Sequence, residues 1–295
     1  MNNKPKLTRR SVFKGLVLGG LWYLLSPFLR TALSEESPIL SIKPLEKKDS
    51  IGETFAGEEL KYSISFWWFK KAAEARITFS RKEDGGYLVS IEAETLGLIG
   101  FVTRYRKDIY YSHLEEVEGG KRLRSYLFEK EVTIGKRIRR GFVKLDYNNR
   151  TMTMKSWGGG KKEVHKENPI PPGIIYDDAL AAFFNFRYGA YGSIKEGKRY
   201  SIHTFPKKGV SVIKIRIATE EEKKKRLKPI PKGVRYLADV RMDKNLFGSQ
   251  TGNVEVLFSE DMTTLAGILK DIIFFGDIKG ILVKKGRNNK KIGDQ

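Results

Sequence analysis

Apolar and polar residues alternate along most of the chain from residue 57 onward. In residues 60–66, LKYSISF, an apolar side chain occupies every second position. Because successive side chains of a β-strand point to opposite faces, this period of two predicts strands with one buried face. Similar runs lie at 75–81, 87–95, 105–111, 124–133, 136–147 and 151–157, and again at 199–205, 210–219, 234–242, 254–258, 268–275 and 278–284.

Tight turns separate the predicted strands of the first group. EDGG at 83–86, EGG at 118–120 and YNN at 147–149 are typical turn sequences. Short strands joined by tight turns pair with their neighbours in antiparallel order. The pattern therefore predicts a mainly β fold, either an antiparallel curved sheet or an incomplete barrel. The glycine-rich apolar run LGLIGFV at 96–102 predicts a bulge or a short turn within it.

One short helix is expected between the two groups of strands. Residues 177–188, DDALAAFFNFRY, place Asp177 and Asp178 at the positive end of the helix dipole and large apolar residues at helical spacing. The charged segment EEEKKKRLK at 220–228 predicts either a solvated hairpin tip or a short helix. Strands and helices do not alternate regularly, so a parallel α/β fold is not expected.

The first 34 residues have the order of an export signal. Residues 1–14 carry five basic and no acidic side chains, and residues 15–29 form an uncharged, mostly apolar run. Spanning a bilayer takes ~20 apolar residues, so this shorter run suits the core of a signal peptide. Small residues at positions 32 and 34 predict cleavage before Glu35. We therefore expect export to the periplasm or the cell envelope.

The basic part of this segment resembles a twin-arginine signal. In TRRSVFK at 8–14, Arg9 and Arg10 follow a hydroxyl residue and precede an apolar pair and a lysine. Bacterial receptors read such signals, which makes the twin-arginine translocase an expected partner. A general secretory signal that happens to contain paired arginines is the alternative.

These patterns divide the chain into four parts. Residues 1–34 are predicted as the signal peptide and residues 35–56, with two prolines and mixed charges, as a linker. Residues 57–284 are predicted as a single β-rich domain. The basic segment 285–295 is predicted as a disordered tail.

A surplus of basic residues narrows the range of partners. The chain has 56 Lys and Arg against 35 Asp and Glu, and removal of residues 1–34 leaves 50 against 35, a net charge of +15. Such a surface attracts polyanions, namely nucleic acid, anionic lipid or acidic glycan. Because an exported protein does not meet the chromosome, we expect an anionic lipid or glycan of the envelope and no nucleic acid.

Residue types that bind metals or act as nucleophiles are scarce. The chain has no cysteine, which excludes disulfides, thiolate metal sites and a cysteine nucleophile. Its three histidines, His113, His165 and His203, are far apart and lack the spacing of metal ligands. We expect no metal and no cofactor, and the sequence assigns no catalytic residue.

Several segments together resemble a known family. They are GEELKYSISF at 57–66, KKAAEARITF at 70–79, YRKDIYYSHLEE at 105–116, DDALAAFFNFRYGAYGSIKEGKRYSI at 177–202 and FFGDIKGILV at 274–283. The chain resembles the bacterial exported proteins of the domain of unknown function 3108 family over residues 57–283. Two features depart from that family: Ala72-Ala73 in place of Ala-Gly, and the long basic excursion at 220–232. The resemblance implies an exported, β-rich domain and no established activity.

The densest aromatic cluster provides the first candidate ligand site. Trp67 and Trp68 end a predicted strand and are followed closely by Lys70 and Lys71. Aromatic faces stack on sugars and cover acyl chains, and lysines pair with anionic groups, so this segment is a candidate wall of a ligand groove. The alternative is that one tryptophan lies in the core and the other packs under the linker.

The predicted helix provides the other candidates. Arg187, on the same helix as Phe183 and Phe184, is a candidate ligand for a phosphate or carboxylate. It could equally form an ion pair with Asp177, Asp178 or a strand carboxylate. The two aspartates are alternative candidates for the paired carboxylates of glycoside hydrolysis, although adjacent acids at a helix start more often serve as caps.

Three functions are compatible with these features. We expect a non-catalytic, exported binding protein for an anionic lipid or glycan of the envelope. The alternatives are an enzyme that hydrolyses cell-surface polysaccharide with Asp177 or Asp178, and a structural envelope protein that binds others through its edge strands.

Overall fold

The structure is a computed structural model that describes residues 44–206, 212–243, 249–272 and 276–288. The expected signal peptide at 1–34 lies outside these residues, as do most of the tail and the first part of the linker. Within the described residues, no helix is both long and apolar enough to cross a membrane.

The described residues form fourteen strands and four short helices. In chain order the elements are α2 (Ile51–Phe55), β1 (Glu58–Phe66), β2 (Phe69–Arg81), β3 (Tyr87–Thr95), α3 (Gly97–Thr103), β4 (Lys107–Val117), β5 (Arg122–Ile134), β6 (Arg137–Asp146), β7 (Thr151–Gly158), β8 (Val164–Pro169), α4 (Ala179–Tyr188), β9 (Arg199–His203), β10 (Val212–Ile217), α5 (Glu220–Arg226), β11 (Tyr236–Arg241), β12 (Asn253–Phe258), β13 (Thr264–Ile272) and β14 (Gly276–Arg287).

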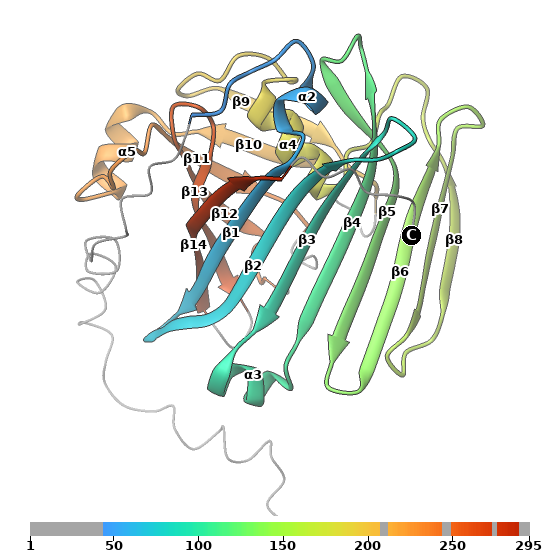
Figure 1. Ribbon diagram of the computed structural model, residues 1–295, viewed down its shortest axis with the longest axis horizontal. Helices are drawn as coiled ribbons and strands as arrows, with labels where there is room; N and C mark the ends of the chain where they lie inside the picture. The colour runs from blue at the N-terminus through green and yellow to red at the C-terminus, as the bar shows by residue number, and fades with distance from the viewer. Residues whose placement is uncertain (1–43, 207–211, 244–248, 273–275, 289–295) are drawn as a thin grey trace, which may run out of the picture. The chain divides into compact units, whose positions relative to one another are not determined.

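All fourteen strands belong to one open antiparallel sheet. Their order is β8-β7-β6-β5-β4-β3-β2-β1-β14-β13-β12-β11-β10-β9. Apart from the β1–β14 pair at the centre, every strand pairs only with strands that come directly before or after it in the sequence. The first strand pairs with the last, Tyr62 lying opposite Leu282, and this pairing joins the two meanders at the middle of the sheet. Figure 1 shows β1 and β14 side by side between the two flanks. The predicted antiparallel curved sheet is confirmed.

The predicted helix is α4, and its ends are defined by the residues that the sequence places there. The Asp178 carboxylate accepts hydrogen bonds from the Leu180 and Ala181 amides at 2.7 and 3.0 Å, which caps the helix. Gly189 ends it with a φ of 91°, a conformation that glycine adopts without steric cost.

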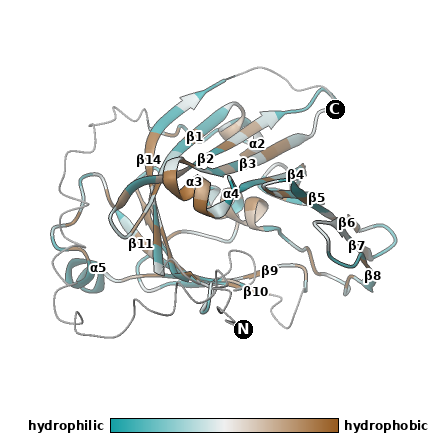
Figure 2. Cartoon of the chain, turned by 90° about the horizontal axis from the view of Figure 1, so that it is seen from below, coloured by the Kyte–Doolittle hydropathy of each residue, from teal (hydrophilic) through white to brown (hydrophobic). Residues whose placement is uncertain are grey.

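Helix α4 packs on one face of the sheet, called here the inner face. Leu180, Ala181 and Phe184 join the core built on β2–β7, and Ala182 and Phe186 join a second core built on β9–β12. Figure 2 shows this largely hydrophobic helix with strands of both flanks around it. One helix therefore supplies apolar surface to both halves of the sheet, which positions the two flanks by shared packing.

Two helices were not expected from the sequence. Residues 97–103 form α3, where a bulge or a short turn was predicted. The charged segment forms α5, the short helix that was one of its two predicted structures, and Thr219 and Glu222 make its capping box. Residues 51–55, within the predicted linker, form α2, whose Ile51 and Phe55 are fully buried. The period-two pattern could not reveal α2, because it contains a single helical turn with only two apolar anchors. The domain accordingly begins before residue 57, and β14 extends to Arg287.

Candidate functional site

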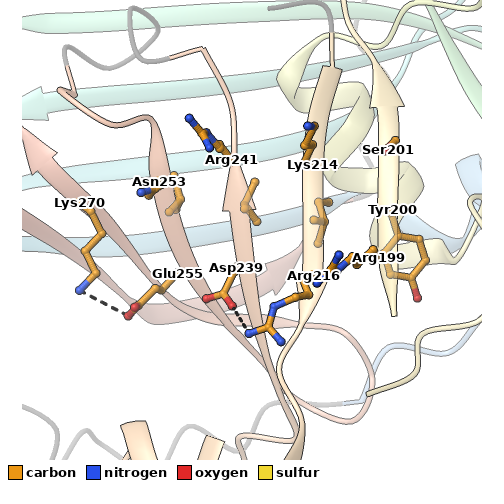
Figure 3. Close-up of a pocket in the computed structure, with 13 residues that line it drawn as sticks. Arg199, Tyr200, Ser201, Lys214, Arg216, Asp239, Arg241, Asn253, Glu255 and Lys270 are labelled. Carbon is orange, nitrogen blue, oxygen red and sulfur yellow. Dashed lines mark hydrogen bonds and ion pairs between the residues drawn. The ribbon is translucent and has the colours of Figure 1, made fainter. Parts of the chain in front are cut away.

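The face of β9–β13 opposite α4, called here the outer face, contains a charged groove of about 640 Å³. The strand pattern explains its chemistry. In β10, Ile213, Ile215 and Ile217 point to the core shared with α4, so Lys214 and Arg216 between them point to the outer face. Figure 3 shows these two side chains beside those of Arg199 and Arg241 from the neighbouring strands.

Strand register arranges the groove side chains in two rows that cross the strands. In the first row Arg199, Arg216, Asp239 and Glu255 lie opposite one another on successive strands. In the second row Ser201, Lys214, Arg241 and Asn253 do so. Directly opposite side chains in an antiparallel pair have Cβ atoms about 5 Å apart, so neighbouring members of one row can act on a single bound group.

Ion pairs engage Arg216, Asp239 and Glu255 of the first row. Asp239 pairs with Arg216 at 3.0 Å and with Arg226 of α5 at 2.6 Å. Glu255 pairs with Arg226 at 2.8 Å, and Lys270 on β13 approaches it at 3.5 Å. The acidic side chains of the groove are thus engaged by its own cations and by α5.

The second row has no such compensation. Lys214 and Arg241 lie directly opposite each other and are both exposed, and no carboxylate among the described residues is within ion-pair distance of either. Like charges placed opposite each other destabilise a sheet by roughly 0.2–1 kcal/mol. Ser201 and Asn253 flank the pair with a hydroxyl and an amide, both of which can donate hydrogen bonds. This arrangement suits an anion such as phosphate or carboxylate.

The tryptophans and lysines predicted as a ligand wall lie away from this groove. Trp67 and Trp68 form the turn between β1 and β2, are 62% and 76% exposed, and have ring centroids 5.4 Å apart. Lys70 and Lys71 follow as exposed residues at the start of β2. Neither tryptophan is in the core or packed under another segment, so they form a separate surface.

The predicted helix residues lie inside the core. Phe184 is buried, and Phe183 is half-buried between the β2–β7 core and a small cluster on β1, β2 and β14. Arg187 is fully buried, donates to both carboxylate oxygens of Glu58 at 2.6 and 2.9 Å, and donates from Nε to the Met262 carbonyl at 2.9 Å. Its guanidinium therefore holds α4 to β1 and cannot reach a ligand at the surface.

Asp177 and Asp178 are also fully buried, so they do not face each other across a groove. Asp178 caps α4 and accepts a hydrogen bond from the Ser112 hydroxyl at 2.6 Å. Asp177 accepts hydrogen bonds from Arg122 and from the Tyr191 hydroxyl, both at 2.8 Å. Their partners tie α4 to β4, β5 and the segment after the helix, and the geometry for glycoside hydrolysis is absent.

Burial of Asp177 gives the protein a specific pH dependence. Burial raises the pKa of this carboxyl from 3.8 to about 6, although Arg122 and Tyr191 act in the opposite direction. The folded protein then binds this proton more tightly than the unfolded chain does, so the unfolding free energy falls as pH rises from about 3.8 to about 6. A pKa difference of this size lowers the free energy of unfolding by about 3 kcal/mol at most between these two pH values.

We expect Asp177→Asn to remove the part of the pH dependence of stability that comes from this carboxyl. Urea unfolding at intervals between pH 4 and pH 7 should give a shallower decline for the variant than for the parent chain. Parallel curves for the two proteins would show that Asp177 is ionised throughout this range.

The groove was not anticipated from the sequence, although one signal was present. VIKIRI in β10 and RYSIH in β9 put basic residues at the polar positions of apolar-polar alternation. Such residues usually occupy an unremarkable solvated face. The pairing of β10 with β11 in register, which brings Lys214 to Arg241, depends on tertiary structure. Among the described residues, no group of three or more His, Asp or Glu is placed to hold a metal ion.

Comparisons with known proteins identified a matching family model and a similar solved structure. The model of a family described as "Protein of unknown function (DUF3108)" matches residues 61–283. A crystal structure described as a beta-barrel-like protein of domain of unknown function DUF1849, from Brucella abortus, is similar with a TM-score of 0.44 and 12% identity. The similarity covers 79% of this chain and 98% of that one. No curated protein matches the chain.

Proposed function

The chain belongs to the DUF3108 family, whose description states no function, and on that premise we propose that it is a non-catalytic binding protein for an anionic component of the cell envelope. The bound group is a phosphate or a carboxylate, carried by a glycan or by a lipid headgroup. The observation that carries the proposal is the pair of exposed, uncompensated cations Lys214 and Arg241, opposite each other in the groove.

The character of the groove favours a polar ligand. Its apolar lining residues, including Tyr200, Ile215 and Val240, are buried and belong to the core on the other side of the sheet. What a ligand meets is a row of hydroxyl, ammonium, guanidinium and amide groups. Charge-assisted hydrogen bonds from such groups are the strong contacts in recognition of phosphates and carboxylates. An acyl chain would find little apolar surface there.

Location in the envelope is part of the same proposal. It is supported by the order of charges and apolar residues at 1–34 and by the resemblance of 8–14 to a twin-arginine signal. A net charge of +15 for the remaining chain suits the anionic polymers and lipids of that compartment. The polysaccharide hydrolysis alternative receives no support, because its candidate carboxylates are buried.

The test is a titration with tripolyphosphate as a small polyanion probe, on protein recovered from the periplasmic fraction of expressing bacteria. We expect Lys214→Gln/Arg241→Gln to raise the dissociation constant by about 100-fold or more, because each lost charge-assisted hydrogen bond costs about 1.5–3 kcal/mol. Without ligand the double variant should be slightly more stable than the parent, since two like charges are removed.

The matched control is Lys144→Gln/Lys166→Gln, which removes two exposed lysines on β6 and β8 and lowers the net charge equally. It should bind the probe nearly as tightly as the parent chain. Equal weakening in both double variants would mean that the probe senses total charge only, and failure to recover the chain from the periplasm would remove the assigned location.

A further inference from the structure

Figure 1 shows α3 and the turn between β1 and β2 in its lower part, at one end of the sheet. This end presents large apolar side chains to solvent. They come from the β1–β2 turn, from α3 and from the residues just after it, and each is at least 60% exposed: Trp67, Trp68, Leu98, Phe101, Val102 and Tyr105. We call this surface the aromatic end. Soluble proteins leave single apolar residues exposed, but a group of six on two adjoining elements is typical of an interaction site.

The aromatic end is held in place by packing beneath it. Phe66, Ala72 and Ile99 are buried together, with Phe69 against them, so the turn and α3 share a small core. The Leu96 amide also donates to the Ala72 carbonyl at 2.8 Å, which fixes the start of α3 on β2. The exposed residues therefore belong to ordered elements whose opposite side is packed in the small core.

The turn between β5 and β6 extends the same end. The Gly135 amide donates to the Arg104 carbonyl at the end of α3, at 2.8 Å. Ile134 and Ile138 on either side of this turn are further exposed apolar residues. Three segments, at 67–71, 96–107 and 134–140, thus meet at one end of the sheet.

These three segments are strongly and uniformly basic. They contain two, three and four Lys or Arg residues, nine in all, and no Asp or Glu. Some of the nine reach back to carboxylates on the strands, as Arg106 does to Asp108 at 2.8 Å. Arg104, Lys136 and Arg137 have no carboxylate within ion-pair distance among the described residues.

We propose that the aromatic end docks on the surface of an anionic lipid bilayer. Tryptophan and tyrosine rings concentrate at the interface between headgroups and acyl chains, and aliphatic side chains beside them enter the same layer. Each Lys or Arg close to an anionic surface adds about 1 kcal/mol of attraction. The centre of a protein–protein interface is depleted in lysine, so the lysines at 70, 71, 107 and 136 favour lipid over a protein partner.

The turn itself supports a role for its aromatic residues. Trp67 has a φ of 48°, in the left-handed region that two-residue hairpin turns usually fill with Gly, Asn or Asp. A bulky residue is strained in this conformation, so turn geometry does not explain its presence. Docking is distinct from ligand binding in the charged groove, because the two surfaces share no residue.

The absence of cysteine allows a direct test in the full chain. A single environment-sensitive dye is attached at Val102→Cys on α3, or at Asn148→Cys in the β6–β7 turn, at the other end of β6. Vesicles contain phosphatidylglycerol and phosphatidylcholine. We expect the dye at position 102 to shift to an apolar emission on these vesicles and the dye at 148 to stay aqueous. Attachment through the apolar run at 15–29 alone would leave both dyes aqueous.

Two sets of variants in the Val102→Cys chain separate the contributions. Trp67→Ser/Trp68→Ser should abolish the emission shift. Arg104→Gln/Lys136→Gln/Arg137→Gln should raise the concentration of anionic lipid that gives half of the shift by on the order of 100-fold. All five residues are exposed, so circular dichroism should show unchanged folding. An aqueous dye at position 102 on vesicles, or an equal shift on pure phosphatidylcholine, would overturn the proposal.

Discussion

We expect Arg187→Met to lower the free energy of unfolding by about 3–5 kcal/mol. The guanidinium is fully buried and bidentate with Glu58, so its removal leaves a carboxylate without a partner inside the protein. It also lies over the rings of Phe55, Phe183 and Phe184, at 4.7, 5.1 and 5.3 Å from their centroids, and these cation–π contacts are lost as well. Urea unfolding followed by circular dichroism measures the difference.

The control for this prediction is a double-mutant cycle with Glu58→Leu. Replacing both members of a buried ion pair by apolar residues is often neutral, so Glu58→Leu/Arg187→Met should recover most of the stability lost in either single variant. Additive losses in the double variant would mean that the two side chains act independently. The same variants should bind tripolyphosphate like the parent chain, because neither residue lines the groove.

Phe184→Ala should have an effect of similar size, about 3–5 kcal/mol, because it opens a cavity where several elements meet. The Phe184 ring lies 4.9 Å from the rings of both Phe55 and Phe79, so α4, α2 and β2 all pack against it. Its side chain is 1% exposed, which leaves no route for solvent to compensate the loss. The measurement is again urea unfolding at constant pH.

Phe183→Ala on the same helix is the matched control. Phe183 is only half-buried, so its substitution by alanine should lower the free energy of unfolding clearly less than Phe184→Ala does. Equal losses of unfolding free energy in the two variants would show that the cluster of Phe55, Phe79 and Phe184 contributes no more to stability than the packing of Phe183. Loss of ligand binding in folded Phe184→Ala protein would instead indicate that α4 takes part in recognition.

Local pattern was sufficient to predict the class of fold. The alternation in LKYSISF marks β1, and acids followed by apolar residues at helical spacing mark α4, because both signals depend on residues close together in the sequence. Strand β8 was missed because VHKENP is almost entirely exposed at a sheet edge and has no buried face to impose alternation.

The sites could be predicted less well, because they depend on contacts between distant residues. Arg187 forms an ion pair with Glu58, which lies 129 positions away in the sequence. This contact places in the core an arginine that the sequence offered as a candidate ligand-binding residue. Lys214 and Arg241 become neighbours only through the register of β10 and β11. The exposure of Trp67 and Trp68 likewise follows from the packing of α3 beneath their turn.

The pairing of β1 with β14 has a consequence for biosynthesis. Until the last strand leaves the ribosome, β1 is an edge strand with one row of backbone amides and carbonyls unpaired. The same holds for β14 before it docks, so the sheet closes at its centre only when the whole domain has been made. Unpaired edges recruit strands from other molecules, and contacts between distant residues slow folding. The nascent chain is therefore exposed to aggregation until β14 has been made and has paired with β1.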